Sequence, residues 1–235
     1  MRALLPVFFW AEPHERPAGT INELSFMYAF LFKHFARICP SRVLDVGTGT
    51  SSLPHLMSHC GAGVIAIDKF RGYWGRRPLN RHFQVMADDI CSSRIQGSFD
   101  LITCIDVIQH VPGHLAAMQT MARLLRPGGC LIVGFFYNEN HYVPDVYRLE
   151  GSNAYGRGAT YGCQIISRKE VEEWVQSAGL RIVDQELWSC FSGEYWSFGE
   201  RLQPPRLGSS TAPHHVACLC LEKTVNDPVR LTGQV

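Results

Sequence analysis

The feature that most constrains the fold is a set of short apolar runs that alternate with helical or loop segments. Each run is apolar almost throughout, which is typical of strands that are buried on both faces of a parallel sheet. Successive parallel strands are joined by crossovers that place helices on the faces of the sheet. The sequence therefore predicts an α/β fold with a doubly wound, mostly parallel sheet. The first five runs span residues 42–46, 63–67, 83–86, 99–105 and 130–136.

Helical patterns flank these runs. Apolar residues recur at helical spacing from residue 21 to about 38, which predicts an amphipathic helix ahead of the core. A second helical face precedes Pro127-Gly128-Gly129, which we expect to end that helix. Ser167 and Glu170 form a capping box, which predicts a third helix running to about Ala178.

Two further strand patterns, at residues 181–187 and 215–222, bring the expected sheet to seven strands, with insertions after the fifth and sixth strands. A chain of 235 residues with 46% hydrophobic content is long for one average domain but short for two. We therefore expect a single domain. Its parts are an N-terminal arm and helix (1–40), a core that carries the ligand site (41–136), a substrate-side insertion (137–166), the C-terminal part of the sheet (167–224) and a tail (225–235).

Charge and cysteine content limit the classes of partner. The net charge of +1 gives no general attraction to nucleic acid, although a local patch could still bind one. Nine cysteines, several of them within apolar runs, show no zinc-ligand spacing, so we expect free thiols, no metal and a reducing compartment, the cytoplasm. No apolar run approaches the length that spans a bilayer, so no membrane association is expected.

Polar residues follow four of the predicted strands. Because the carboxyl ends of parallel strands meet at one edge of a sheet, these residues should converge on a single cleft. The four groups are Asp45-Val46-Gly47-Thr48-Gly49-Thr50-Ser51, Asp68, Asp88-Asp89 and Cys104-Ile105-Asp106.

Charge also distinguishes between two candidate ligands of this cleft, a nicotinamide dinucleotide and S-adenosylmethionine. Asp68 follows its strand and lies 19 residues after Gly49, where a carboxylate can accept hydrogen bonds from both ribose hydroxyls of an adenosine. That position fits a nicotinamide dinucleotide as well as S-adenosylmethionine. Asp45 would repel the pyrophosphate of a dinucleotide, whereas it favours the ammonium and sulfonium of S-adenosylmethionine. Ser51 also replaces the third glycine of the dinucleotide fingerprint.

At the level of whole motifs, the chain resembles the class I S-adenosylmethionine-dependent methyltransferases in both order and spacing. The resemblance implies S-adenosylmethionine as the cofactor and a seven-stranded sheet whose last strand is antiparallel. It is specific for the superfamily and much less so for the substrate. The segments that carry it are residues 43–49, 66–68, 87–90, 99–104, 107–111 and 124–129.

The resemblance also implies roles around the cofactor. The loop after the first strand would contact the methionine portion, the acid after the second strand the ribose, and the acidic segment after the third strand the adenine. The end of the fourth strand would lie near the sulfonium. The candidate cofactor-binding residues are Asp45, Gly47, Thr48, Gly49, Asp68, Lys69, Asp88, Asp89, Ile90, Cys104 and Ile105.

Candidates for the substrate side come from less specific signals. His110 is the candidate general base, because a histidine titrates near neutrality, with a structural role as the alternative. Tyr142 and Tyr147 either line an aromatic substrate pocket or pack the insertion onto the sheet. Arg76, in the loop 69–82, either binds an anionic group or is a solvated loop charge.

The predicted reaction is methyl transfer from S-adenosylmethionine to an N, O or C atom of a small molecule by in-line displacement. Proximity and alignment are its main requirements, and a strong base is not always needed, so the acceptor atom stays open. The alternatives are a methyltransferase of protein or RNA, a nicotinamide-dependent oxidoreductase, and a non-catalytic binding module. The oligomeric state also stays open.

Overall fold

The structure, a computed structural model, describes residues 22–70, 80, 82–152, 161–208 and 213–225, and within these ranges nine strands form one sheet. The strands are β1 (Arg42–Val46), β2 (Gly63–Asp68), β3 (Val85–Ala87), β4 (Phe99–Ile105), β5 (Leu125–Asn138), β6 (Ile166–Ser167), β7 (Leu180–Phe191), β8 (Arg201–Leu207) and β9 (Val216–Lys223). The α-helices of the described residues are α2 (Leu24–Ile38), α3 (Leu53–His59), α4 (His114–Leu124) and α5 (Arg168–Ala178). Short 3₁₀ turns are η1 (Ile90–Ser92), η2 (Ile108–His110) and η3 (Val146–Arg148).

The strand order is β3-β2-β1-β4-β5-β9-β7-β8, and β6 pairs with β5 beside that path. Strands β1 to β5 run parallel, whereas β9 is antiparallel to both β5 and β7. The doubly wound, mostly parallel sheet is therefore confirmed, as is its antiparallel last strand. Within the described ranges, β6 and β8 are additional to the seven strands expected.

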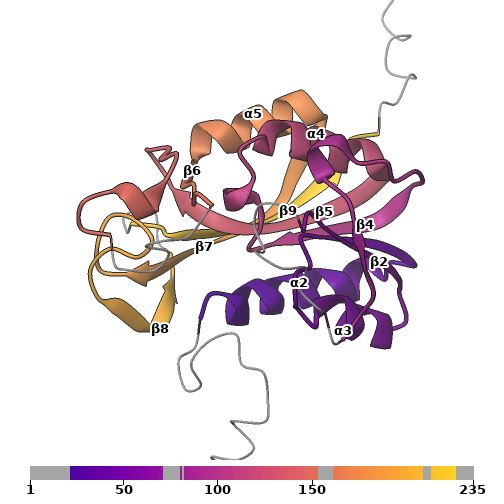
Figure 1. Cartoon of the computed structure of the whole chain (residues 1–235), viewed down its shortest axis with the longest axis horizontal. Helices are drawn as coiled ribbons and strands as arrows, with labels where there is room; N and C mark the ends of the chain where they lie inside the picture. Colours follow the sequence, from indigo (N-terminus) through magenta and orange to yellow (C-terminus); the bar gives the residue numbers. More distant parts are fainter. Residues whose placement is uncertain (1–21, 71–79, 81, 153–160, 209–212, 226–235) are drawn as a thin grey trace, which may run out of the picture.

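Two apolar cores lie on opposite faces of the sheet, with α4 and α5 above it and α2 and α3 below it in Figure 1. Neighbouring strand residues alternate between these cores. Leu44 and Ile102 belong to the core beneath α4 and α5, whereas Val43 and Leu101 belong to the core beside α2 and α3. Both sets are buried, which explains why the runs are apolar throughout rather than alternately polar.

The segment Pro127-Gly128-Gly129 lies within β5, so the expectation that it ends the preceding helix is wrong. Helix α4 already ends at Leu124, because Leu125 takes an extended conformation and pairs with Phe99 of β4. The register between β4 and β5 then shifts, and a Cβ atom on Gly129 would lie 2.9 Å from the Phe99 carbonyl oxygen. The glycine thus permits the close approach of two strands.

The capping box is confirmed at the start of α5. The Ser167 hydroxyl accepts a hydrogen bond from the Lys169 backbone N–H, and the Glu170 carboxylate accepts one from the Ser167 backbone N–H. Gly179 ends the helix with a φ of +63°, a left-handed conformation that favours glycine.

Both insertions pack against the sheet in their described parts. In the first, Val143 and Ile165 form an antiparallel bridge that closes the base of the loop. In the second, β8 pairs with β7, and the Trp196 ring stacks on Phe136 of β5 at a centroid distance of 3.9 Å. The second insertion therefore extends the sheet by one edge strand and also covers the end of β5.

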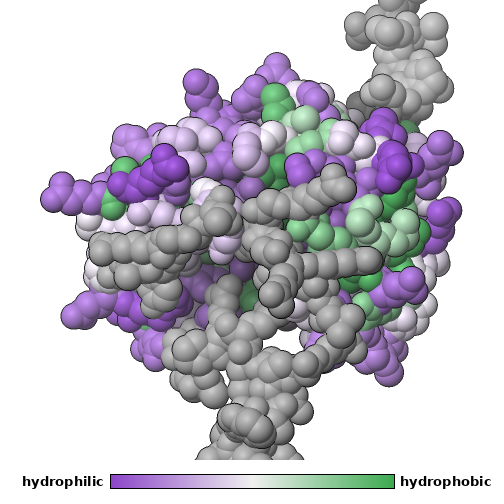
Figure 2. All heavy atoms as spheres, in the orientation of Figure 1, coloured by the Kyte–Doolittle hydropathy of each residue, from purple (hydrophilic) through white to green (hydrophobic). Residues whose placement is uncertain are grey.

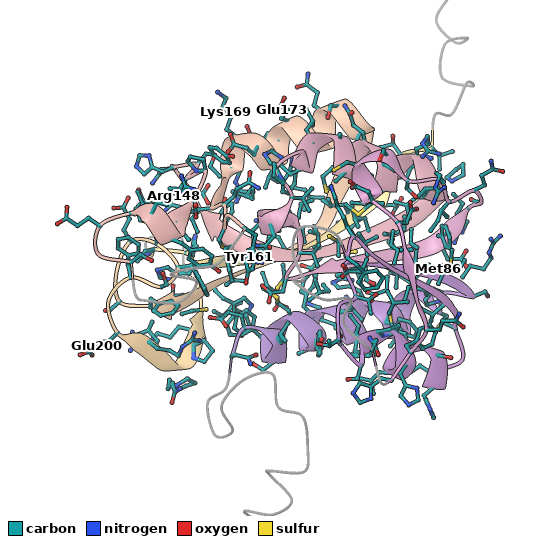
Figure 3. All side chains as sticks on the ribbon, in the orientation of Figure 1. Met86, Arg148, Tyr161, Lys169, Glu173 and Glu200 are labelled. Carbon is teal, nitrogen blue, oxygen red and sulfur yellow. The ribbon has the colours of Figure 1, made fainter. Side chains whose placement is uncertain are left out.

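The two edge strands of the sheet, β3 and β8, lie at opposite sides of the molecule. In Figure 3, Met86 on the edge strand β3 is at the right, and Glu200, directly before β8, is at the left. Figure 2 shows hydrophilic side chains along most of the outline of this face and hydrophobic ones mainly on its right-hand half. No helix in the described part of the chain is long and apolar enough to cross a bilayer.

Candidate active site

A cavity of about 770 Å³ opens at the carboxyl edge of the central strands. It lies where β1 and β4 are neighbours, which is where the strand order reverses and where doubly wound sheets form their ligand crevice. The ends of β1, β2 and β4, the segments after β3 and β4, helix α2 and the first insertion all line it. Its volume falls within the range of small-ligand pockets, about 300–1,000 Å³.

Asp45 lines the cavity at the end of β1 and is only 2% exposed. Its two carboxylate oxygens accept hydrogen bonds of 2.6 Å from the hydroxyls of Thr48 and Thr103. Burial raises the pKa of Asp45 to about 6 although these hydroxyls oppose the rise, and the nearby charge of Asp68 adds to it. Asp45 therefore holds the turn after β1 and, when ionised, places a negative charge beside the cavity.

We expect the affinity for S-adenosylmethionine to fall as the pH is lowered through about 6. The folded-state pKa of Asp45 lies above its ordinary value of 3.8, so the carboxylate takes up a proton in this window and no longer attracts a cationic ligand. The fall is at most about tenfold per pH unit for this single group. Calorimetric titrations from about pH 7.5 to about pH 5 should show a flatter profile for Asp45→Asn than for the wild type. Identical profiles would contradict the prediction.

The glycine turn after β1 is fixed by bonds to β2. The backbone N–H groups of Gly47 and Thr48 donate to the Ile67 carbonyl oxygen at 2.8 and 3.1 Å. The Gly49 N–H donates to Asp68 Oδ2 at 2.8 Å. Asp68, 8% exposed, therefore lines the cavity and also shapes the turn.

The acidic segment after β3 lines the next part of the cavity, together with Lys69. Asp89 accepts a hydrogen bond from the Cys91 N–H at 3.0 Å and pairs with the Lys69 ammonium at 2.5 Å. Burial alone would raise the pKa of Asp89, but these two partners hold it below its usual value. Asp88 and the buried Ile90 also line the cavity, so the structure brings this predicted group together.

The end of β4 requires a correction. Ile105 lines the cavity, but Cys104 is fully buried in the core beneath α4 and α5 and is not among the lining residues. Ile105 is the last residue of β4, whereas the Cys104 side chain packs into that core. Cys104 is therefore withdrawn as a cofactor contact.

His110 lines the cavity at the end of η2 and contacts the first insertion there. Its Nδ1 lies 3.1 Å from the Gly162 carbonyl oxygen, and its ring meets the Tyr161 ring edge to face at 5.0 Å. A carbonyl oxygen only accepts, so Nδ1 donates, and Nε2 is then the basic nitrogen of the neutral ring. Tyr161 lies near the middle of the molecule in Figure 3.

The tyrosines predicted to bind substrate do not line the cavity. Tyr142 is 40% exposed at the surface. Tyr147 packs beside Tyr161, with ring centroids 6.4 Å apart, and Tyr161 and Gly162 are the residues by which the first insertion reaches the cavity. Tyr147 thus fits the packing alternative, Tyr142 lies at the surface of the insertion, and Arg76 lies outside the described residues.

Helix α2 forms a wall of the cavity that the sequence analysis did not assign. Leu24 and Tyr28 line it, and the Tyr28 hydroxyl lies 3.1 Å from Ser51 Oγ in the glycine turn. In the sequence, Leu24 and Tyr28 were marked only by the helical spacing of apolar residues. That spacing is the same for a side chain that faces a core and for one that faces a ligand, so it could not have distinguished them.

The charge of the cavity fits S-adenosylmethionine. Its described lining carries five aspartates and one lysine, which favours the cationic ammonium and sulfonium groups and opposes a pyrophosphate. Within the described ranges, no group of three or more His, Cys, Asp or Glu side chains could hold a metal ion. The aspartates are Asp45, Asp68, Asp88, Asp89 and Asp106.

Sequence comparison relates the chain to known methyltransferases. The family model described as "Methyltransferase domain" matches residues 14–185. A ubiquinone biosynthesis O-methyltransferase of Xanthomonas campestris is 29% identical over 223 residues, covering 88% of this chain and 86% of that protein. A protein of the same name from Coxiella burnetii is 28% identical over 183 residues, covering 72% of this chain and 76% of that protein.

A solved structure has the same fold. The 1,6-didemethyltoxoflavin-N1-methyltransferase of Burkholderia thailandensis, which holds 1,6-didemethyltoxoflavin and S-adenosylhomocysteine, matches with a TM-score of 0.57 and 19% identity. The match covers 95% of this chain and 89% of that one. The family match spans most of the chain, and the glycine turn and acidic strand ends meet at one cavity. The chain belongs to the methyltransferase-domain family and is a class I S-adenosylmethionine-dependent methyltransferase.

Proposed function

We propose that the enzyme methylates a hydroxyl oxygen of a small, flat, uncharged molecule, with His110 as the general base. The observation that carries this proposal is the hydrogen bond between His110 Nδ1 and the Gly162 carbonyl oxygen, which makes Nε2 the basic nitrogen. The relatives from Xanthomonas campestris and Coxiella burnetii are named O-methyltransferases, which supports oxygen as the acceptor atom.

The shape of the acceptor follows from the part of the cavity that the cofactor roles leave over. The ends of β1 and β2 and the segment after β3 are assigned to the cofactor. Besides these, the described lining includes Leu24, Tyr28, Asp106, Val107, His110, Val111 and Tyr161. Apolar and aromatic walls of this kind suit a flat ring that is largely buried on binding.

The charge of the acceptor follows from the acidic lining. An anionic group would be repelled at short range by the aspartates of the cavity, whereas a neutral phenol would not be. The same acidic lining opposes a polyanionic substrate such as RNA, and the overall net charge of +1 gives no general attraction to one. We therefore place a small molecule, rather than a nucleic acid, in this site.

When bound, S-adenosylmethionine would supply an electrophilic methyl group, whose bond to sulfur breaks as the bond to the acceptor oxygen forms, so that neutral S-adenosylhomocysteine leaves. His110 Nε2 accepts the proton of the acceptor hydroxyl as the carbon–oxygen bond forms, while Nδ1 stays bonded to the Gly162 carbonyl. Tyr28 and Tyr161 orient the ring, and Leu24 helps to exclude water. Proximity, alignment and exclusion of water supply much of the lowering of the barrier in a displacement of this kind.

The test is methyl transfer to two matched probes, catechol and aniline, followed by mass spectrometry. We expect methylation of catechol on oxygen, and a loss of roughly 10²–10⁴-fold in kcat for His110→Ala, because that is the usual contribution of a general base. The Kd for S-adenosylhomocysteine should stay within about twofold, since the general base acts on the acceptor and not on the cofactor.

His55→Ala is the control, because His55 is an exposed histidine on α3 and should leave kcat unchanged. Methylation of aniline without methylation of catechol would show that the acceptor is nitrogen. If His110→Ala keeps the wild-type kcat, His110 is not the general base.

We also propose that the enzyme acts in the cytoplasm. All nine cysteines lie within the described residues, and each is a free thiol there. Six of them are buried, in surroundings where a thiol acts as a small apolar group. Unpaired cysteines in this number are typical of a reducing compartment.

A further inference from the structure

Trp196, in the second insertion, joins elements that are far apart in the sequence. Its indole Nε1 donates to Glu23 Oε1 at 3.0 Å, across 173 residues, and its ring stacks on Phe136. Arg201 Nη1 donates to the same Glu23 oxygen at 2.9 Å. Trp196 and Glu23 are both buried, and neither is among the residues that line the cavity.

Glu23 controls the position of one wall of the acceptor site. It directly precedes α2, whose residues Leu24 and Tyr28 line the cavity. A buried carboxylate is costly unless it is paired and hydrogen-bonded, so its bonds to Trp196 and Arg201 fix the start of this helix against the second insertion.

Trp196 is also connected to a second part of the cavity lining through a row of aromatic rings. Its ring centroid lies 6.3 Å from that of Tyr147, which lies 6.4 Å from that of Tyr161, which lies 5.0 Å from that of His110. Tyr161 and His110 both line the cavity. Movement of the Trp196 ring would therefore be transmitted to both walls.

We propose that Trp196 and Glu23 are positioning residues that set the width of the acceptor site. They hold α2 and the first insertion at a fixed separation without touching either ligand. The proposal rests on the proposed function only for the choice of acceptor probe. It predicts that substitutions at these residues raise KM for the acceptor and leave the affinity for the cofactor unchanged.

The first test is a kinetic comparison with catechol as acceptor. Trp196→Phe removes the indole donor, and Glu23→Ala removes its acceptor. Each should raise KM for catechol about tenfold or more, because small misplacements of reacting groups are costly, while Kd for S-adenosylhomocysteine stays within about twofold. Glu23→Gln should restore most of the wild-type KM, because its amide oxygen can still accept both hydrogen bonds.

The second test needs no acceptor. In the complex with S-adenosylhomocysteine, backbone hydrogen exchange of peptides covering residues 24–30 and 161–165 should be faster in Trp196→Phe than in the wild type. Faster exchange at both segments is expected because one residue holds both walls.

Two variants control for general loss of stability. Trp174→Phe removes an indole hydrogen bond to His114, 3.0 Å long, in the opposite core. Asp184→Ala removes one carboxylate partner of Lys33 and of His34 farther along α2, and Lys33 keeps Glu186. Both should lower Tm and leave KM for catechol unchanged.

Unchanged KM and unchanged exchange in Trp196→Phe would overturn the proposal, and so would an equal rise of KM in the two controls. If the wild type does not methylate catechol, the proposed O-methylation is wrong in this form. The exchange measurement then still decides whether Trp196 holds the two walls.

Discussion

Asp68→Ala should weaken the binding of S-adenosylmethionine roughly a hundredfold or more, because we propose that the Asp68 carboxylate accepts hydrogen bonds from both ribose hydroxyls, each worth about 1.5–3 kcal/mol. Asp68 lies at the end of β2, lines the cavity and is 8% exposed. The substitution also removes the acceptor for the Gly49 N–H, which loosens the turn that faces the ligand. Calorimetric titration with S-adenosylmethionine and with S-adenosylhomocysteine measures the effect.

Asp100→Ala is a matched control. Asp100 also accepts backbone hydrogen bonds, from Ser41 and Arg42 at 3.0 and 2.9 Å, but it lies at the opposite edge of the sheet, near the start of β4. Its loss should lower Tm and leave the cofactor affinity unchanged. A folded Asp68→Ala protein with wild-type affinity would exclude the ribose role.

The second large effect is expected for Gly47→Ala, which should abolish measurable cofactor binding and lower stability. Gly47 has a φ of +75°, and a Cβ atom there would lie 2.4 Å from both methyl carbons of Val107. The strained backbone and the steric overlap each cost about 1–3 kcal/mol. Because the turn can relieve the overlap only by moving, its backbone no longer fits the ligand. Denaturant unfolding and calorimetry measure the two effects.

Gly61→Ala separates the two causes. Gly61 also has a positive φ, +98°, but among the described residues no heavy atom beyond its two chain neighbours lies within 4 Å of its added Cβ, so only the backbone cost remains. Val107→Ala in the Gly47→Ala background removes the two clashing methyl carbons and should recover part of the stability. If Gly61→Ala is as destabilising as Gly47→Ala, the steric argument fails.

The sequence by itself determined the fold class and the strand-end residues that meet at the cavity. Apolar runs without alternation specify strands that are buried on both faces, and this pattern is local. A residue that directly follows such a strand is carried to the carboxyl edge of the sheet by the strand itself. Asp45, Gly47, Asp68 and Asp89 were therefore placed correctly at the cavity from their positions in the chain.

Local patterns were ambiguous at two other positions. Glycines after a helical face can end a helix or allow two strands to approach, and only the pairing of β5 with β4 showed which applied to Gly128 and Gly129. The sequence likewise did not show which face of β4 each side chain takes. The sheet decided that Ile105 lines the cavity and that Cys104 is in the core.

Only the tertiary structure decided which other elements line the cavity. Tyr28 and Tyr161 reach the cavity from two separate elements, and the hydrogen bond between Trp196 and Glu23 joins residues 173 positions apart. No local periodicity specifies which distant element covers a given side chain. Such contacts are chosen by the packing of the whole chain, because helical spacing and aromatic content are the same for a residue that fills a core and for one that lines a ligand site.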